Sequence, residues 1–126
     1  MKNECYCTNK LPYEQCCEPI VSGASSAQTA EQLMRSRYSA FVQQLEDYLR
    51  STWHPTRRPS RVGFNSKQQW IGLTIKSTSK GMHNDETGDV EYVARFKIDG
   101  KAHRLHENSH FVKEDDQWFY VDGDFL

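Results

Sequence analysis

The chain has 126 residues and a formal net charge of −1, from 16 basic and 17 acidic residues. This length suits one domain with at most a short appendage, and a near-neutral chain does not attract nucleic acid or anionic membrane by its field alone. Hydrophobic residues make up 37% and aromatic residues 12%, which is typical of a globular domain rather than a disordered chain. The first residues lack the apolar run of a signal peptide, and no stretch has the length of a transmembrane helix. We therefore expect a cytoplasmic protein that binds neither membrane nor nucleic acid.

All the cysteines lie near the N-terminus, in the spacing Cys5-x-Cys7-x8-Cys16-Cys17. Four thiolates complete the tetrahedral shell of Zn²⁺ and leave no position for water, so the spacing predicts structural zinc with these four cysteines as ligands. Two disulfides, 5/7 and 16/17, are the alternative, and a reducing compartment disfavours them. A catalytic thiol needs a nearby base, and the first histidine of the chain is His54.

The segment from Cys5 to Cys17 resembles the SEC-C motif, a zinc knuckle also found at the C-terminus of the SecA translocation ATPase. The family usually has Gly-Ser-Gly-Lys where this chain has Thr8-Asn9-Lys10-Leu11. Turns between ligands often need positive φ, which Asn9 tolerates better than Lys10. The resemblance implies a structural zinc ion and a docking surface for a protein partner. We expect the knuckle over residues 1–22 and a domain with its own, separate core over residues 29–126.

Helical periodicity follows the knuckle. Thr29 and Gln32 have the spacing of a capping box, and apolar residues then recur at helical intervals as far as Thr52. One long helix and two consecutive helices both fit this pattern. His54-Pro55 ends it, because the residue before proline is disfavoured in a helix, and residues 55–69 are predicted to form a loop.

The second half of the sequence has the two-residue period of β-strands. Ile71, Leu73 and Ile75 alternate with Trp70, Gly72 and Thr74, and the clearest alternation runs from Val90 to Ile98. Asp99-Gly100 predicts a two-residue hairpin turn, and a last strand is predicted from Gln117 to Asp122. The turn fixes four opposing pairs: Ile98 with Lys101, Phe96 with His103, Ala94 with Leu105, and Tyr92 with Glu107. Helices followed by an antiparallel meander indicate an α+β fold.

Several of these segments together resemble the YchJ-like bacterial proteins. They are Thr29–Tyr38, Thr52–Pro55, Leu105–Glu107 and Trp118–Gly123. The resemblance implies a SEC-C knuckle ahead of a domain similar to nuclear transport factor 2. In that fold, helices pack against a curved antiparallel sheet and form a cone with a cavity. The family is uncharacterised, so the resemblance implies a fold and a metal but no activity.

Polar residues also occupy positions that face the predicted core. Arg37 falls within the apolar stripe of the first helix, and Glu107 shares a strand face with Leu105 and lies across from Tyr92. Arg37, Tyr92 and Glu107 are therefore candidates for the interior of the cone. In the functional interpretation Glu107 is a general base or ligand anchor and Arg37 holds an anion. In the simpler interpretation, which we favour, Arg37 and Glu107 form a buried ion pair that closes the helix onto the sheet.

The leading hypothesis is a non-catalytic, zinc-stabilised binding module. In this hypothesis the knuckle contacts a protein partner and the cone holds a small ligand. The alternative is a small enzyme of hydrolase or isomerase type that uses Glu107 and Arg37 in the cavity. A third interpretation, nucleic-acid binding by the knuckle, is disfavoured by the neutral charge and by Glu4, Glu14 and Glu18.

Overall fold

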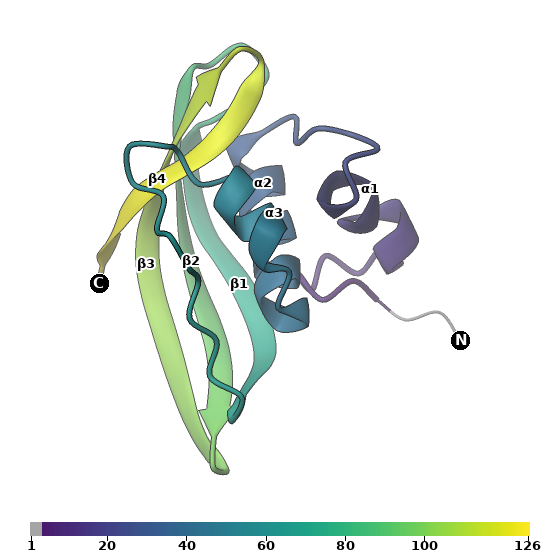
Figure 1. Cartoon of the computed structure of the whole chain (residues 1–126), viewed down its shortest axis with the longest axis vertical. Coiled ribbons are helices and arrows are strands. Elements are labelled where there is room, and N and C mark those ends of the chain that lie inside the picture. The colour runs from purple at the N-terminus through teal and green to yellow at the C-terminus, as the bar shows by residue number, and fades with distance from the viewer. Residues whose placement is uncertain (1–3) are drawn as a thin grey trace.

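The computed structural model describes residues 4–126, so residues 1–3 of the predicted knuckle lie outside the described residues. Short helices come first and a four-stranded antiparallel sheet follows, which confirms the α+β prediction (Figure 1). The strands pair in chain order, as a meander. The elements are η1 (Tyr13–Gln15), α1 (Glu18–Val21), α2 (Ala30–Gln43), α3 (Glu46–Ser51), β1 (Gln68–Lys80), β2 (Thr87–Ile98), β3 (Lys101–Glu114) and β4 (Gln117–Phe125).

Helix α2 begins where the capping box predicts. The Thr29 hydroxyl accepts a hydrogen bond from the Gln32 amide at 3.0 Å, and the Gln32 side chain accepts one from the Gln28 amide at 2.7 Å. The helix ends at Gln43, and its C-cap residue Gln44 has a left-handed φ of 59°. The helical pattern is thus divided into two consecutive helices, α2 and α3.

The β2–β3 hairpin has the predicted register. Asp99 and Gly100 both have positive φ, at 51° and 80°, as a two-residue primed turn requires. All four predicted cross-strand pairs are present, including Tyr92 opposite Glu107. This register places both side chains on the face of the sheet that α2 covers, and each is buried.

Strand β1 departs from simple alternation. A register shift lies between Trp70 and Gly72, and a second lies between Ile75 and Ser77. Because a bulge inserts one residue, it exchanges the two faces of the strand. Ile71 is consequently 47% exposed, whereas Leu73 is buried.

The knuckle and the domain share one core. Cys5, Cys7 and Cys17 are buried in the same apolar cluster as Leu33 of α2 and Phe111 of β3. In Figure 1, α2 lies between the sheet and the knuckle, so that it packs against both. The prediction of a separate domain core is therefore wrong. The boundary between residues 1–22 and 29–126 stays a prediction.

The helices of the described residues are short. None of them is long and apolar enough to cross a membrane.

Candidate functional site

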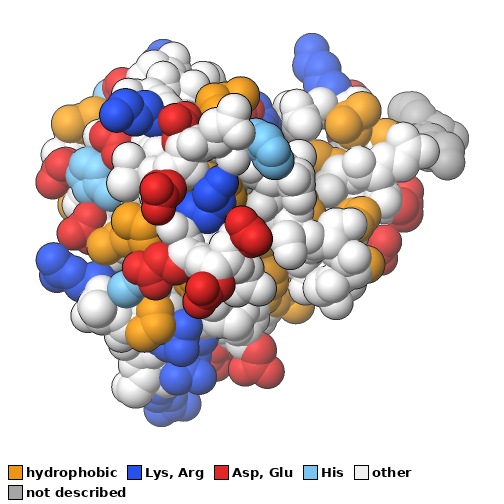
Figure 2. Space-filling view, turned by 90° about the horizontal axis from the view of Figure 1, so that it is seen from above, with side chains coloured by type: hydrophobic (Ala, Val, Ile, Leu, Met, Phe, Trp, Pro, Cys, Tyr) orange, Lys and Arg blue, Asp and Glu red, His pale blue; other side chains and the backbone are white. Residues whose placement is uncertain are grey.

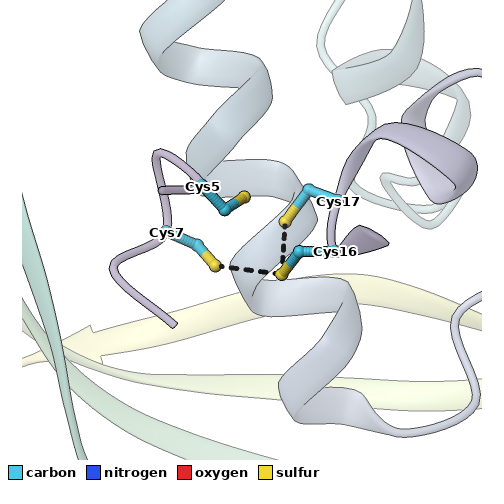
Figure 3. Close-up of side chains that lie close together, drawn as sticks. All are labelled: Cys5, Cys7, Cys16 and Cys17. Atoms are coloured by element: carbon cyan, nitrogen blue, oxygen red, sulfur yellow. Dashed lines mark hydrogen bonds between the residues drawn. The ribbon is translucent and has the colours of Figure 1, made fainter. Parts of the chain in front are cut away.

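The four cysteines converge beside α2 (Figure 3). Their Sγ atoms all lie within 4.8 Å of one another, with Cys7 and Cys16 at 3.6 Å and Cys16 and Cys17 at 3.9 Å. All four thiols are free rather than joined in disulfides. Bonds of about 2.3 Å to a tetrahedral ion place sulfur atoms about 3.8 Å apart. The donor set and its spacing therefore fit a metal ion such as Zn²⁺.

The turn after Cys7 keeps its shape without glycine. Positive φ falls on Thr8, at 63°, and on Lys10, at 61°, which are the two positions where the SEC-C pattern usually has glycine. Asn9 does not take this conformation. The Thr8 hydroxyl donates to the carbonyl of Leu73 in β1 at 2.6 Å. This bond ties the turn to the sheet and helps to hold a backbone conformation that threonine rarely adopts.

Polar groups surround the sulfur atoms. The Asn9 amide donates to Cys16 Sγ at 3.8 Å, and Ser39 Oγ lies 3.6 Å from Cys5 Sγ. Arg35 Nη1 donates to the Cys7 carbonyl at 2.9 Å and lies 3.9 Å from Cys7 Sγ. Glu31 holds Arg35 through a 2.9 Å ion pair one helical turn earlier. Such outer contacts orient metal ligands and offset the charge of thiolates.

The buried thiols of Cys5, Cys7 and Cys17 lie close together and do not ionise independently. Cys17, followed by Cys7, donates toward the Cys5 sulfur, and these contacts lower the pKa of Cys5. The Cys5 and Cys7 sulfur atoms, together with burial, raise the pKa of Cys17. Ionisation of the first thiol therefore disfavours ionisation of its neighbours. A divalent cation that binds all four sulfur atoms would instead favour the ionised form of each thiol. It would therefore release protons as it binds.

A second feature is a cavity of about 220 Å³ between α2 and the sheet. Its wall is mostly aromatic and aliphatic. Arg37, Tyr92 and Glu107, which the sequence singles out, all line it, as do Ser109 and Tyr120. The fold therefore brings the predicted interior residues to one cavity.

Arg37 is 4% exposed, but it does not pair with Glu107. Its Nη1 donates to the Leu49 carbonyl at 2.8 Å and to Thr52 Oγ1 at 2.7 Å. Its guanidinium carbon lies 4.9 Å from the centre of the Trp53 ring and 4.7 Å from that of Tyr120. Burial lowers the pKa of Arg37 to about 10, so the side chain stays charged at neutral pH. The predicted Arg37–Glu107 ion pair is therefore wrong, because the end of α3 supplies the acceptors.

The Glu107 carboxylate binds two tyrosines instead. Tyr92 donates to Oε1 at 2.5 Å, and Tyr120 donates to Oε2 at 3.0 Å. Burial, followed by the nearby charge of Glu107, raises the pKa of both tyrosines. Both phenols therefore remain protonated and keep donating to the carboxylate.

Sequence reasoning missed Ser109 and Tyr120. Ser109 is 1% exposed, and its hydroxyl forms no hydrogen bond with any described residue, although it lies near Tyr92. Strand alternation was the available signal for Ser109, because it lies two residues after Glu107. Trp53 forms a bridge with Tyr120, and the Tyr120 backbone hydrogen-bonds to Thr52 and His54. The sequence carries no local signal for that long-range contact.

A curved antiparallel sheet packed on helices around a cavity, with a cysteine knuckle before it, defines a SEC-C protein with a domain similar to nuclear transport factor 2. The profile of the family described as "YchJ, middle NTF2-like domain" matches residues 29–123. The chain belongs to this YchJ-like family, whose relatives are called UPF0225 proteins.

Two relatives and two solved structures show how far the similarity extends. A UPF0225 protein of Polaromonas naphthalenivorans is 46% identical over 117 residues, which cover 93% of this chain and 85% of the relative. One from Bordetella pertussis is 48% identical, covering 95% and 91%. The solution structure of a SEC-C motif-containing protein from Rhodopseudomonas palustris superposes with a TM-score of 0.86 at 29% identity, covering 98% and 99%. The crystal structure of a SEC-C motif-containing protein from Psychrobacter arcticus gives 0.78 at 28% identity, covering 95% and 81%.

Proposed function

We propose that this protein is a zinc-stabilised binding module of the cytoplasm that holds a small ligand in its cavity without catalysing a reaction. The observation that carries the zinc assignment is the convergence of four free, mostly buried thiols within 4.8 Å. Four sulfur ligands suit Zn²⁺ and close its coordination shell, which makes the ion structural rather than catalytic. The cytoplasmic location that we propose would favour the same assignment, because thiols there remain reduced.

Elemental analysis tests the zinc assignment. The full chain, purified without chelator, should carry about one Zn²⁺ per chain, and Cys16→Ser should lower the occupancy. Tyr6→Ser is the matched control, because Tyr6 lies between two ligands but is 44% exposed and offers no sulfur. Metal-free protein, or equal zinc content in both variants, would overturn the assignment.

The non-catalytic part of the proposal rests on Glu107. A general base needs an oxygen that is free to accept a proton from the substrate. Both Glu107 oxygens already accept a tyrosine hydroxyl, at 2.5 and 3.0 Å, so this carboxylate links β3 to β2 and β4 and keeps only the second lone pair of each oxygen for a substrate. The enzyme alternative requires a substrate that reaches one of these remaining lone pairs or displaces Tyr92 or Tyr120 from Glu107.

The knuckle supports the proposal of a protein partner. Tyr6 and Leu11, on either side of the turn between ligands, are each 44% exposed. A photo-crosslinking residue at position 11 should capture one partner in cells. The same residue at position 71, which is 47% exposed on the sheet, is the control. Adducts that are equal at both positions, or absent at position 11, would argue against a docking surface there.

We propose no role in binding nucleic acid or membrane. The formal net charge of −1 supports this, as does the mixture of acidic and basic side chains over the face in Figure 2. Fluorescence anisotropy with labelled single- and double-stranded oligonucleotides should therefore show no binding at physiological salt.

A further inference from the structure

The polar groups of the cavity are unequally satisfied. The carboxylate of Glu107 accepts a hydroxyl on each oxygen, so both of its oxygens already have a hydrogen-bond donor. Arg37 is different. Both acceptors of its Nη1 are neutral, and it forms no ion pair with any carboxylate of residues 4–126. Arg37 is therefore the cavity group that has no direct ionic partner, and the Glu107 carboxylate of the same cavity acts on its charge only from a distance.

Arg37 also keeps hydrogen-bonding capacity. Its Nε–H and Nη2–H donors bind no described residue, and the guanidinium packs against the Trp53 and Tyr120 rings, which also contact each other. The side of a guanidinium that carries Nε and Nη2 presents two parallel donors, which match the two oxygens of a carboxylate. Because the rings fix the guanidinium, little further ordering is needed when a ligand binds.

Ser109 is an independent observation on the same wall. Its hydroxyl is buried and lies near Tyr92, but it forms no well-aligned hydrogen bond with any described residue, although buried polar atoms nearly always form one. Leaving such a group unsatisfied destabilises the folded protein. A ligand that offers it an acceptor would offset that destabilisation.

The rest of the cavity wall determines the size and polarity of the part of the ligand that lies away from Arg37 and Ser109. It is formed mainly by apolar and aromatic side chains, among them Phe41, Trp70 and Leu105. A volume of about 220 Å³ corresponds to about seven water molecules at about 30 Å³ each. This space suits one small ring or a short chain, and it does not suit a nucleotide or a peptide.

We propose that the cavity binds a small monocarboxylate with an apolar body, whose carboxylate contacts the Nε/Nη2 side of Arg37 and the hydroxyl of Ser109. This inference rests on the proposed ligand-binding role of the cavity. It names the chemical class of the ligand and two residues that would recognise it.

Three probes of matched shape test whether the cavity prefers a negatively charged head group. Phenylacetate, 2-phenylethanol and 2-phenylethylamine differ in the head group, and their binding to the full chain can be titrated by NMR. Phenylacetate should bind at least about tenfold more tightly than the other two, because a charge-assisted hydrogen bond is stronger than a neutral one. If the alcohol or the amine binds as tightly, the carboxylate assignment is wrong and the ligand-binding module stands. If none of the probes binds, both proposals fail.

Variants test the two residues. Arg37→Gln should abolish the preference for phenylacetate, and Arg57→Gln is the matched control, because Arg57 is 60% exposed and pairs with Asp122.

Since Arg37→Gln can also fail to fold, Ser109→Ala is a second variant. It removes a hydroxyl that makes no hydrogen bond with a described residue, so the melting temperature should not fall while phenylacetate affinity drops several-fold. Unchanged affinity in a folded Ser109→Ala would remove Ser109 from the site, and unchanged preference in a folded Arg37→Gln would overturn the inference.

Discussion

Gly123 of β4 determines where the carboxylate of Glu107 can lie. A Cβ atom at position 123 would overlap the Glu107 carboxylate. Any larger residue would therefore push the carboxylate out of its hydrogen bonds with Tyr92 and Tyr120. The absence of a side chain at position 123 thus allows the Glu107 carboxylate to reach both tyrosines, although Gly123 has no functional group of its own.

We predict that Gly123→Ala lowers the free energy of unfolding by about 1–3 kcal/mol, the usual range for overpacking a filled site. Urea denaturation of the full chain measures this change. Gly72→Ala is the control, because it also lies in a strand and its Cβ would meet nothing within 4 Å. Equal stability of the two variants would show that Glu107 moves aside at no cost.

At the same scale, the sequence predicts which side chains face inward but not which of them bind each other. Helical periodicity places Arg37 in the interior, and strand alternation with the hairpin register does the same for Tyr92 and Glu107. The actual partner of Arg37 depends on Leu49 and Thr52, at the end of a helix that packs across α2. That packing follows from the break at Gln44, which no local pattern indicates.

Among the elements, the β2–β3 hairpin determines where Tyr92 and Glu107 lie in the cavity. Its turn places Tyr92 opposite Glu107, and a shift of one residue would turn both side chains to the other face. Gly100 carries a φ of 80°, which β-branched residues strongly disfavour. The turn residues therefore control the position of groups far along the strands.

Gly100→Val should lower the free energy of unfolding by about 1–3 kcal/mol through backbone strain alone. Steric overlap does not contribute, because a Cβ at position 100 meets nothing within 4 Å. Gly63→Val is the matched control, with equal space and without positive φ. Thermal unfolding compares the two, and a Gly63→Val variant that is destabilised as much as Gly100→Val would contradict the turn argument.

Elements with a strong local signal are the ones that the sequence predicts well. The Thr29 cap and the Asp99-Gly100 turn are both present, because each depends on residue types at a fixed spacing, although the Gln32 side chain accepts from the Gln28 amide rather than from that of Thr29. The bulge between Trp70 and Gly72 and the left-handed Gln44 are different, because tertiary packing imposes them on residues of ordinary propensity. The exposed Ile71 follows from that bulge.

Across the whole molecule, the knuckle is part of the core rather than an appendage. Cys5, Cys7 and Cys17 pack with the apolar residues of α2 and of the sheet, and Thr8 hydrogen-bonds to β1. Metal binding that stabilises this segment must therefore also stabilise the domain. Sequence spacing alone predicts the cysteine cluster, but it does not predict that the cluster shares the domain core, because no short-range pattern links residues 5–17 to strands that begin at Gln68.

We therefore predict that metal removal destabilises the whole chain in one transition. A metal at 100 times its dissociation constant adds about 2.7 kcal/mol, and its loss should lower the melting temperature by more than about 5 °C. Trp53, Trp70 and Trp118 lie outside the knuckle, so tryptophan fluorescence reports on the domain. The measurement compares chain treated with a chelator and dialysed against chain reloaded with zinc, with chelator-treated Cys16→Ser, which should show little further change, as the control. An unchanged tryptophan transition after metal removal would mean that the domain is stable without the knuckle, and the shared core would then contribute little to its stability.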